Sequence, residues 1–480
     1  MAANSRFYFV LLSVCAAAGM GNIFLFPYLS YKLTGLFFIP YLIALLILGI
    51  PLLMLEFSIG QHFNRNIVDI FASIKKWFSS IGWLMALNAF ILMSAYAVMI
   101  SYCIIYFFVS LGFQWKNDPN SYFFNNVVQA SNEFSSFAHI SLPVFIALIF
   151  AWIAIFLFVR NGFESIKKGI LAISAPFAAL LLFFMIYALS LDNALAGIHA
   201  FLKPDFRNLF NPAVWISSFS LAAVSLGVSF GIMPAFARRS ENGFIAGTSF
   251  IVIFLKILGS VAIGFITFSI IGFLSLKQQT EISTLAFYNS RNIFTTLAQA
   301  LPFFYRPTLL SMLFFAFMSL FFVFGAASLA YSLVHLLSQK LNSKKRNAAI
   351  LVCGLGFLAG IVFATRPGYF MMDLVLHFIY YNILLAILLE ALAVGWFYNS
   401  GKISEYINQN SNVKLGGMWN LAVKYAVPLV IIFLLALQLR ADILNGYGNY
   451  SRLAMLAFGA GTVAVPVIIA FLLPQKILDK

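Results

Sequence analysis

Polar and flexible residues inside apolar runs are the places where this 480-residue sequence could bind or transform another molecule. Two runs are interrupted near their middle, by G-M-G-N at 19–22 and by S-L-G-V-S-F-G at 225–231. Glycine favours unwinding, and an unwound turn frees backbone N–H and C=O groups that need partners. Freed N–H groups suit a carboxylate and freed carbonyl groups suit a cation. The two interruptions therefore predict a site for both, with close helix packing through glycine as the alternative for 19–22.

The other reactive residue types do not form a catalytic set. Cys15, Cys103 and Cys353 all lie inside apolar runs, so we expect small packing residues and not disulfide or metal ligands. The sequence shows no nucleophile with a neighbouring base, no phosphate-binding loop and no cluster of metal ligands outside these runs. We therefore do not expect an enzyme.

The elements that must position these residues are membrane helices. The chain is 62% hydrophobic and 9% charged, whereas about a quarter of the residues of soluble domains are charged. Apolar runs of about 20 residues recur along it, which predicts an all-α polytopic membrane protein. We expect twelve spans near 7–29, 36–60, 80–112, 140–160, 166–190, 213–237, 245–275, 307–338, 347–365, 372–398, 420–439 and 452–473. The partly apolar stretch 279–303 is expected to form a re-entrant or capping loop.

The basic residues lie in short clusters between the apolar runs. The net charge of +15 is therefore explained by membrane topology, and no nucleic acid partner is expected. Placing the N-terminus inside puts most Lys and Arg on the inside, for example Arg65, Lys75 and Lys76. We expect a multi-pass protein of the plasma membrane with both termini in the cytoplasm, and its oligomeric state stays open.

Several motifs resemble those of the neurotransmitter:sodium symporter family. G-M-G-N-I-F-L-F-P at 19–27 is similar to the family's G-x-G-N-x-x-R-F-P. Further matches are I-P-Y at 39–41, G-I-P-L at 49–52, L-E-F-S-I-G-Q at 55–61, K-P-D-F at 203–206 and P-A-V-W at 212–215. The resemblance implies the leucine-transporter fold, a single domain over 1–480 with broken helices 1 and 6. Its 5+5 inverted repeat would comprise 7–190 and 213–398, followed by two accessory helices in 420–473.

The resemblance also implies a substrate pocket and a buried carboxylate that supports it. The pocket would be lined by Met20, Gly21, Leu92, Tyr96, Val224, Gly227, Phe230, Ser328 and Tyr331. Backbone groups of Met20 and Gly21 and the hydroxyl of Tyr96 would hold the substrate carboxylate, and Phe230 would form one wall. Glu56 would accept hydrogen bonds from the unwound part of span 6.

Two sodium sites are implied, and the sequence departs from both. The first would use the carbonyl of Ala17 and the side chains of Asn22 and Ser225, but its span 7 ligand is apolar here. The second would use carbonyl groups of Cys15, Ala18 and Val323. Its two hydroxyl groups are replaced by Ala326 and Ala327, so Ser328 could serve only if the helix register shifts. Sodium is therefore an expected but weakened ligand, and chloride binding is not expected because Leu221 replaces a polar partner of Tyr41.

The gates and span 7 carry further departures. Leu25 stands where the family has an arginine, and either Asp373 or His377 falls near its acidic partner, so we expect both gates to close by packing. Lys256 lies within span 7, where its side chain either snorkels to the membrane surface or supplies a fixed positive charge in place of a sodium ion. Glu390 is a candidate distant partner of Lys256. If protons replace sodium, Glu56, His335 and His377 are the candidate carriers.

These expectations lead to three hypotheses of function. The first is sodium-coupled symport of a small amino acid or related amine by alternating access. The second keeps the fold but couples transport to protons or to no ion, because sodium ligands are depleted. The third is an amino-acid receptor or channel-like protein without transport, because the usual gates are missing.

Overall fold

The computed structural model describes residues 2–17, 25–33, 37–115, 118–131, 139–240, 244–287, 293–410, 414–448 and 450–473. Within this part of the chain the structure is helical, apart from turns and one bridge between Ile140 and Thr365. Ten of its helical segments are long and apolar enough to cross a membrane. Two shorter apolar helices accompany them, within α1 (Ala2–Ala17) and as α11 (Pro212–Val224). The all-α polytopic membrane protein predicted from the sequence is confirmed.

The ten long segments coincide with ten of the twelve predicted spans. They are built from α3 (Phe38–Ala44) with α4 (Ile50–Phe63), α6 (Ser79–Val109), α8 (Leu142–Val159), α9 (Phe163–Leu189), α13 (Ile245–Gln278), α16 (Pro307–Lys340), α17 (Lys345–Phe363), α18 (Gly368–Leu392) with α19 (Ser400–Gln409), α20 (Gly417–Leu421) with α21 (Val427–Asn445), and α22 (Arg452–Ala454) with α23 (Gly461–Leu472). The tenth predicted span continues past 398, because a π-helical turn at Ala393–Asn399 joins α18 to α19. Twelve crossings remain a prediction, since the first and sixth predicted spans contain only short helices.

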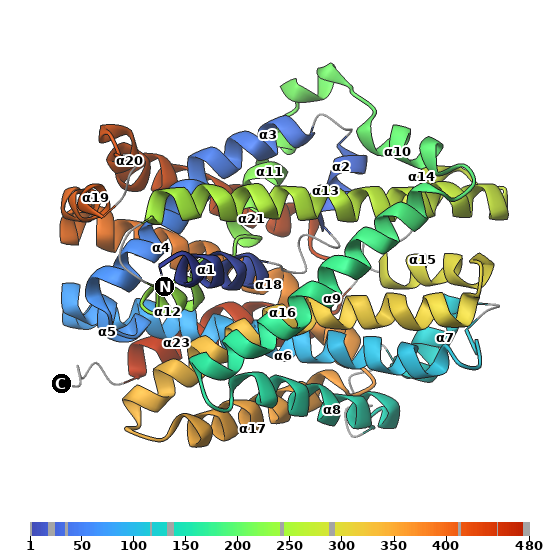
Figure 1. Cartoon of the computed structure of the whole chain (residues 1–480), viewed down its shortest axis with the longest axis horizontal. Helices are drawn as coiled ribbons and strands as arrows, with labels where there is room; N and C mark the ends of the chain where they lie inside the picture. The colour runs from blue at the N-terminus through green and yellow to red at the C-terminus, as the bar shows by residue number, and fades with distance from the viewer. Residues whose placement is uncertain are drawn as a thin grey trace.

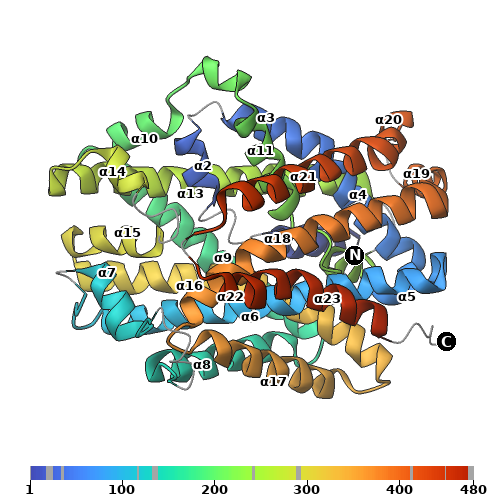
Figure 2. The same cartoon turned by 180° about the vertical axis from the view of Figure 1, so that it is seen from behind.

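Most of the long helices run along the longest axis of the molecule, and α9 crosses them obliquely (Figure 1). α8 and α17 lie at one edge, and α3 and α10 (Ala194–Leu202) lie at the other (Figures 1 and 2). One end, which we call the α5 end, carries α5 (Ile67–Ile74), α19 and α20. The opposite end carries α7 (Pro119–Tyr122), α14 (Ile282–Phe287) and α15 (Ile293–Ala300). The stretch 279–303, expected as a loop, thus contains two short helices.

The sixth predicted span is broken where its glycines and serines predicted a break. α11 ends at Val224 and α12 (Ile232–Ala237) begins at Ile232, so the seven residues 225–231 separate them. Gly227, Ser229 and Gly231 all have positive φ angles, of 69°, 63° and 70°, which ends the helix and turns the chain. In the first predicted span, α1 ends at Ala17 and α2 (Phe26–Lys32) follows. The break expected at 19–22, with Met20, Gly21 and Asn22, lies outside the described residues.

Candidate functional site

The break in span 6 lies directly against the end of α1. A Cβ atom added to Gly227 would lie 2.9 Å from the carbonyl oxygen of Ala16, in the last turn of α1. Only glycine allows this approach, and its φ of 69° also disfavours other residues. The C-terminal end of α1 therefore meets the break that follows α11 inside the protein. The C-terminal ends of α1 and α11 both carry partial negative charge and carbonyl groups without partners in their own helix. Such an arrangement suits a cation.

Two carboxyl groups hold the other side of the break. Glu56 of α4 accepts a hydrogen bond from the backbone N–H of Ser229, which is the contact expected of it. The hydroxyl of Ser229 donates to Glu390 Oε2 of α18 at 3.0 Å. Both carboxyl groups are fully buried, and two neighbouring carboxylates in such a site cannot both be charged. Glu390 thus helps to fix the break, and its contact here is with Ser229 and not with Lys256, its candidate distant partner.

Lys256 reaches the break from α13. Its Nζ donates to Ser225 Oγ at 2.7 Å and to the Tyr41 hydroxyl at 2.6 Å. Ser225 caps the C-terminal end of α11, and Tyr41 lies on α3. The side chain of Lys256 is only 4% exposed. Snorkelling to the membrane surface is therefore wrong for Lys256, and its positive charge lies inside the protein at the end of a half-helix.

The pocket residues expected on α6 and in the break lie beside α16. The ring of Tyr96 is buried and stands 6.2 Å from that of Phe322 on α16. Leu92 lies one turn before Tyr96 on α6 and is partly buried. Phe230 is buried in the break, and its carbonyl accepts a hydrogen bond from Ser332 Oγ of α16 at 3.2 Å. α6 and the break therefore both contact α16, and Val224 and Gly227 lie at the end of α11 and in the break.

Two expected pocket residues, Ser328 and Tyr331, make contacts within α16 and with α12. The hydroxyl of Ser328 donates to the carbonyl of Phe324 in its own helix at 2.8 Å. The ring of Tyr331 stacks on Phe236 of α12, with centroids 5.3 Å apart. Tyr331 therefore packs against the helix that follows the break, and the residue of α16 that touches the break is Ser332. Ser332 lies four residues after Ser328 and therefore on the same face of the helix. This spacing is the sequence signal that could have identified Ser332.

The two expected sodium sites differ in how well their residues fit the ion. In the first, the hydroxyl of Ser225 is bound by the ammonium group of Lys256, so this set does not fit sodium. In the second, α16 continues as a regular helix through Ala326 and Ala327, so Ser328 is not shifted into their place. Cys15 belongs to the last turn of α1. Its carbonyl oxygen and that of Val323 are the described oxygen atoms of this set that could bind sodium. Asn22 and Ala18, one from each set, lie outside the described residues.

Comparison with known proteins decides the family. A sequence model of the sodium:neurotransmitter symporter family matches residues 2–122 and 112–475. The chain belongs to this family. An uncharacterized sodium-dependent transporter of Methanocaldococcus jannaschii is 30% identical over 484 residues, which cover 98% of this chain and 97% of that protein. The family and its named members are transporters and not enzymes, so this symporter-family chain is a transporter with many helices in the membrane.

Animal relatives bind different substrates according to their names. A sodium- and chloride-dependent GABA transporter of Drosophila melanogaster is 26% identical over 450 residues, or 84% of this chain and 47% of that protein. A sodium-dependent nutrient amino acid transporter of Drosophila mojavensis is 27% identical over 485 residues, or 88% of this chain and 74% of that protein. Their names share sodium dependence and differ in substrate.

The residues expected at the outer gate of this family member are tied to α21 and the segment after it. Asp373 accepts hydrogen bonds from the hydroxyls of Tyr447 at 3.0 Å and Tyr450 at 2.6 Å. His377 Nε2 lies 2.9 Å from Asp442 Oδ2, and its ring stacks on Tyr447 at 3.6 Å. Leu25 is 45% exposed and offers no charge. Asp373 and His377 therefore use their polar groups to hold α18 against α21.

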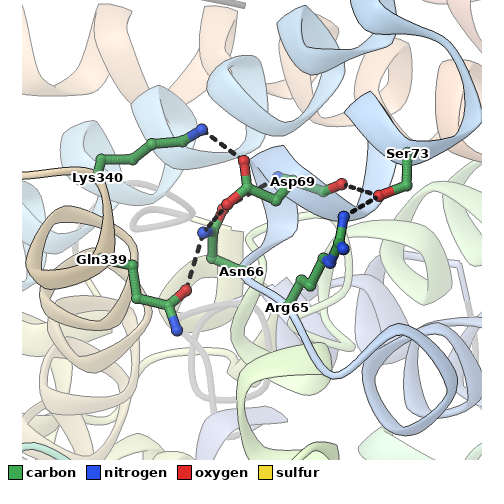
Figure 3. Close-up of polar contacts among 6 residues, drawn as sticks. All are labelled: Arg65, Asn66, Asp69, Ser73, Gln339 and Lys340. Carbon is green, nitrogen blue, oxygen red and sulfur yellow. Dashed lines mark hydrogen bonds and ion pairs between the residues drawn. The ribbon is translucent and has the colours of Figure 1, made fainter. Parts of the chain in front are cut away.

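The α5 end is held by polar contacts between α5 and α16. Lys340 Nζ at the end of α16 lies 2.5 Å from Asp69 Oδ1 on α5. Asn66, which caps the start of α5, donates both to Asp69 Oδ2 at 2.5 Å and to Gln339 Oε1 at 2.9 Å (Figure 3). These contacts clamp α5 to the end of α16.

A second polar contact at the α5 end joins α12 to α16. Arg238 Nη1 lies 2.5 Å from His335 Nε2, and Arg238 Nε donates to Asn64 Oδ1 at 3.0 Å. Because arginine only donates, Nε2 of His335 must accept, which keeps this nitrogen unprotonated. His335 therefore positions Arg238 and is a poor carrier of protons.

Substituting Asp69 by alanine should loosen the α5 end. The change removes both acceptors of Lys340 and Asn66, whose side chains are nearly buried, and we expect a loss of about 1–3 kcal/mol of stability. Thermal unfolding of the purified protein measures it. Asp192→Ala is a matched control because Asp192 is exposed. Equal melting temperatures of the two variants would show that this contact adds no stability.

Proposed function

We propose that the chain is a sodium-coupled symporter that carries a small amino acid across the plasma membrane by alternating access, with both termini cytoplasmic. The observation that carries this proposal is the contact between the end of α1 and the break after α11, where Gly227 lies against Ala16 and Ser229 is held by Glu56. Half-helix ends at mid-depth are how transporters of this build bind ions and anionic groups. The names of the relatives support sodium as the coupling ion and amino acids as substrates.

Sodium would be held by backbone carbonyl groups and not by hydroxyl side chains. The carbonyl of Cys15, in the last turn of α1, and that of Val323 on α16 are the described candidates, with Ala18 as the third expected one. Sodium accepts such oxygen ligands as a hard cation, and a site without side-chain oxygens should bind it weakly. Chloride has no role in this proposal because Leu221 stands where a polar partner of Tyr41 would be needed.

Proton-coupled or uncoupled transport is the second candidate function. The observation that favours it is the loss of both hydroxyl ligands at Ala326 and Ala327 without any shift of α16. Glu56 and Glu390 would then be the groups to test, because their carboxyl groups adjoin the break.

Uptake into proteoliposomes tests the proposal. Amino-acid uptake should require an inward sodium gradient and should vanish when potassium replaces sodium. Tyr96→Phe should weaken the apparent affinity by about 10-fold or more, because a hydroxyl that donates to a carboxylate is lost. Tyr102→Phe is the matched control on α6, since the buried Tyr102 hydroxyl finds no partner among the described residues.

Two outcomes would contradict the proposal. Equal uptake in sodium and in potassium, with a response to a pH gradient, would replace it by the proton-coupled alternative. If Tyr96→Phe and Tyr102→Phe bind substrate equally well, Tyr96 does not hold the carboxylate.

A further inference from the structure

The environment of Lys256 leaves one of its hydrogen-bond donors open. An ammonium group has three donors, and two of them go to Tyr41 and Ser225. The ammonium also lies 5.2 Å from the centre of the Tyr41 ring. Among the described residues, no acceptor for the third donor and no carboxylate paired with Lys256 is found.

The charge of Lys256 is therefore not balanced within the described part of the protein. Its two hydroxyl partners are neutral, and its side chain is almost fully buried. A buried charge without a counter-charge is costly, and lysines inside membrane segments mark functional sites. The partial negative charge at the end of α11, which Ser225 caps, offsets part of this cost. An incoming anion would offset the rest.

The position of Lys256 identifies the kind of anion. Ser225 is the first residue of the break, and Phe230 of the same break contacts Ser332 of α16. The ammonium thus stands at the end of a half-helix, where a bound cation would otherwise lie. The carboxylate of an amino acid bound beside this end would meet a positive charge that is already part of the chain.

We propose that the ammonium group of Lys256 takes the place of the first sodium ion and pairs with the carboxylate of the amino-acid substrate. This inference rests on the proposed function and narrows its substrate class to molecules with a carboxylate. Amines that lack a carboxylate are excluded, because no anion would balance Lys256 and their own ammonium group would be repelled. Transport should use one sodium ion and should not depend on chloride.

Three variants on one helix test the proposal. Lys256→Met removes the charge and keeps an unbranched side chain, and Lys256→Arg keeps the charge. Lys277→Met is the control: it is the same change as Lys256→Met, made at an exposed lysine near the end of α13. Purified proteins are titrated with a panel of amino acids and of their decarboxylated amines, and binding is read from the rise in melting temperature. The titrations are run in sodium chloride, sodium gluconate and potassium chloride.

We expect the wild type and Lys277→Met to bind amino acids but not the corresponding amines, equally well in chloride and in gluconate. Lys256→Met should raise the apparent Kd for the amino acid by about 10- to 100-fold, the range expected for losing a charged hydrogen bond. Lys256→Arg should recover part of this loss. The rise in melting temperature caused by sodium alone should persist in Lys256→Met, because that ion binds elsewhere.

Different results separate this inference from the proposed function. Unchanged amino-acid affinity in a folded Lys256→Met protein would overturn the role of Lys256, as would binding that requires chloride or a sodium dependence that indicates two ions. A different outcome is that the wild type binds amino acids equally well with and without sodium, while Lys256→Met does not bind them. This would overturn sodium coupling and leave the pairing of Lys256 with the carboxylate intact. Should Lys256→Met not fold, Lys256→Arg keeps the test decisive. Amino-acid binding that persists in Lys256→Arg while amines stay unbound supports the role of the charge, and binding of the amines would overturn it.

Discussion

Glu56→Ala should abolish transport and destabilise the folded protein by about 3–5 kcal/mol, as expected when a buried polar partner and several side-chain atoms are removed together. The N–H of Ser229 would lose its acceptor in a site without exposure to water. Ser229 has a positive φ, so this contact holds a strained residue that would otherwise relax. The whole break would then lose the conformation that brings Gly227 against Ala16.

Glu56→Gln separates the role of the hydrogen bond from that of the charge. Glutamine keeps an oxygen that can accept from Ser229, and it ends the repulsion between Glu56 and Glu390. We therefore expect Glu56→Gln to retain most of the stability and transport that Glu56→Ala loses. Melting temperature and proteoliposome uptake are the two measurements. Equal losses in both variants would mean that Glu56 must be able to change its charge, which would favour coupling to protons.

Most of the fold could be predicted because its determinants are local. Apolar runs long enough to cross a bilayer are visible in the sequence, and ten of the twelve expected spans recur with similar boundaries. The break at 225–231 was also visible, since two glycines and two serines within seven residues of an apolar run weaken the helix at that point. The continuation of α18 into α19 was not predicted, because a π-helical turn such as 393–399 has no simple sequence signal.

The site was harder to predict because it depends on which helix faces meet. The partner of Glu56 followed from the family resemblance, but that of Glu390 did not, since it requires α18 to reach the same serine. Lys256 left two interpretations open. Ser249 lies seven residues before Lys256 and Ser260 lies four residues after it, so all three share one buried face of α13. This spacing favoured the interpretation in which Lys256 is buried. That pattern was present in the sequence.

Gly60→Ala should have the second large effect, because it pushes apart the two helices that frame the break. A Cβ atom on Gly60 would lie 2.5 Å from the carbonyl oxygen of Pro234 and 2.6 Å from its Cα atom, both in the backbone of α12. Side chains can rotate away from such a contact, but a backbone must move as a unit. We expect a loss of about 3 kcal/mol, at the upper end for overpacking, and loss of transport.

The predicted defect is specific to the contact between α4 and α12. Moving α12 would pull Gly231 and Ser229 with it, and so would weaken the hydrogen bond to Glu56 on the same helix as Gly60. Gly259→Ala is the matched control, since a Cβ atom there meets no atom within 4 Å and alanine favours the helix. Melting temperatures and sodium-driven uptake of both variants test whether the defect is specific to the contact between α4 and α12. A Gly60→Ala protein as stable and active as Gly259→Ala would show that α12 can move without disturbing the break, and the site would then be less rigidly coupled to α4 than its contacts imply.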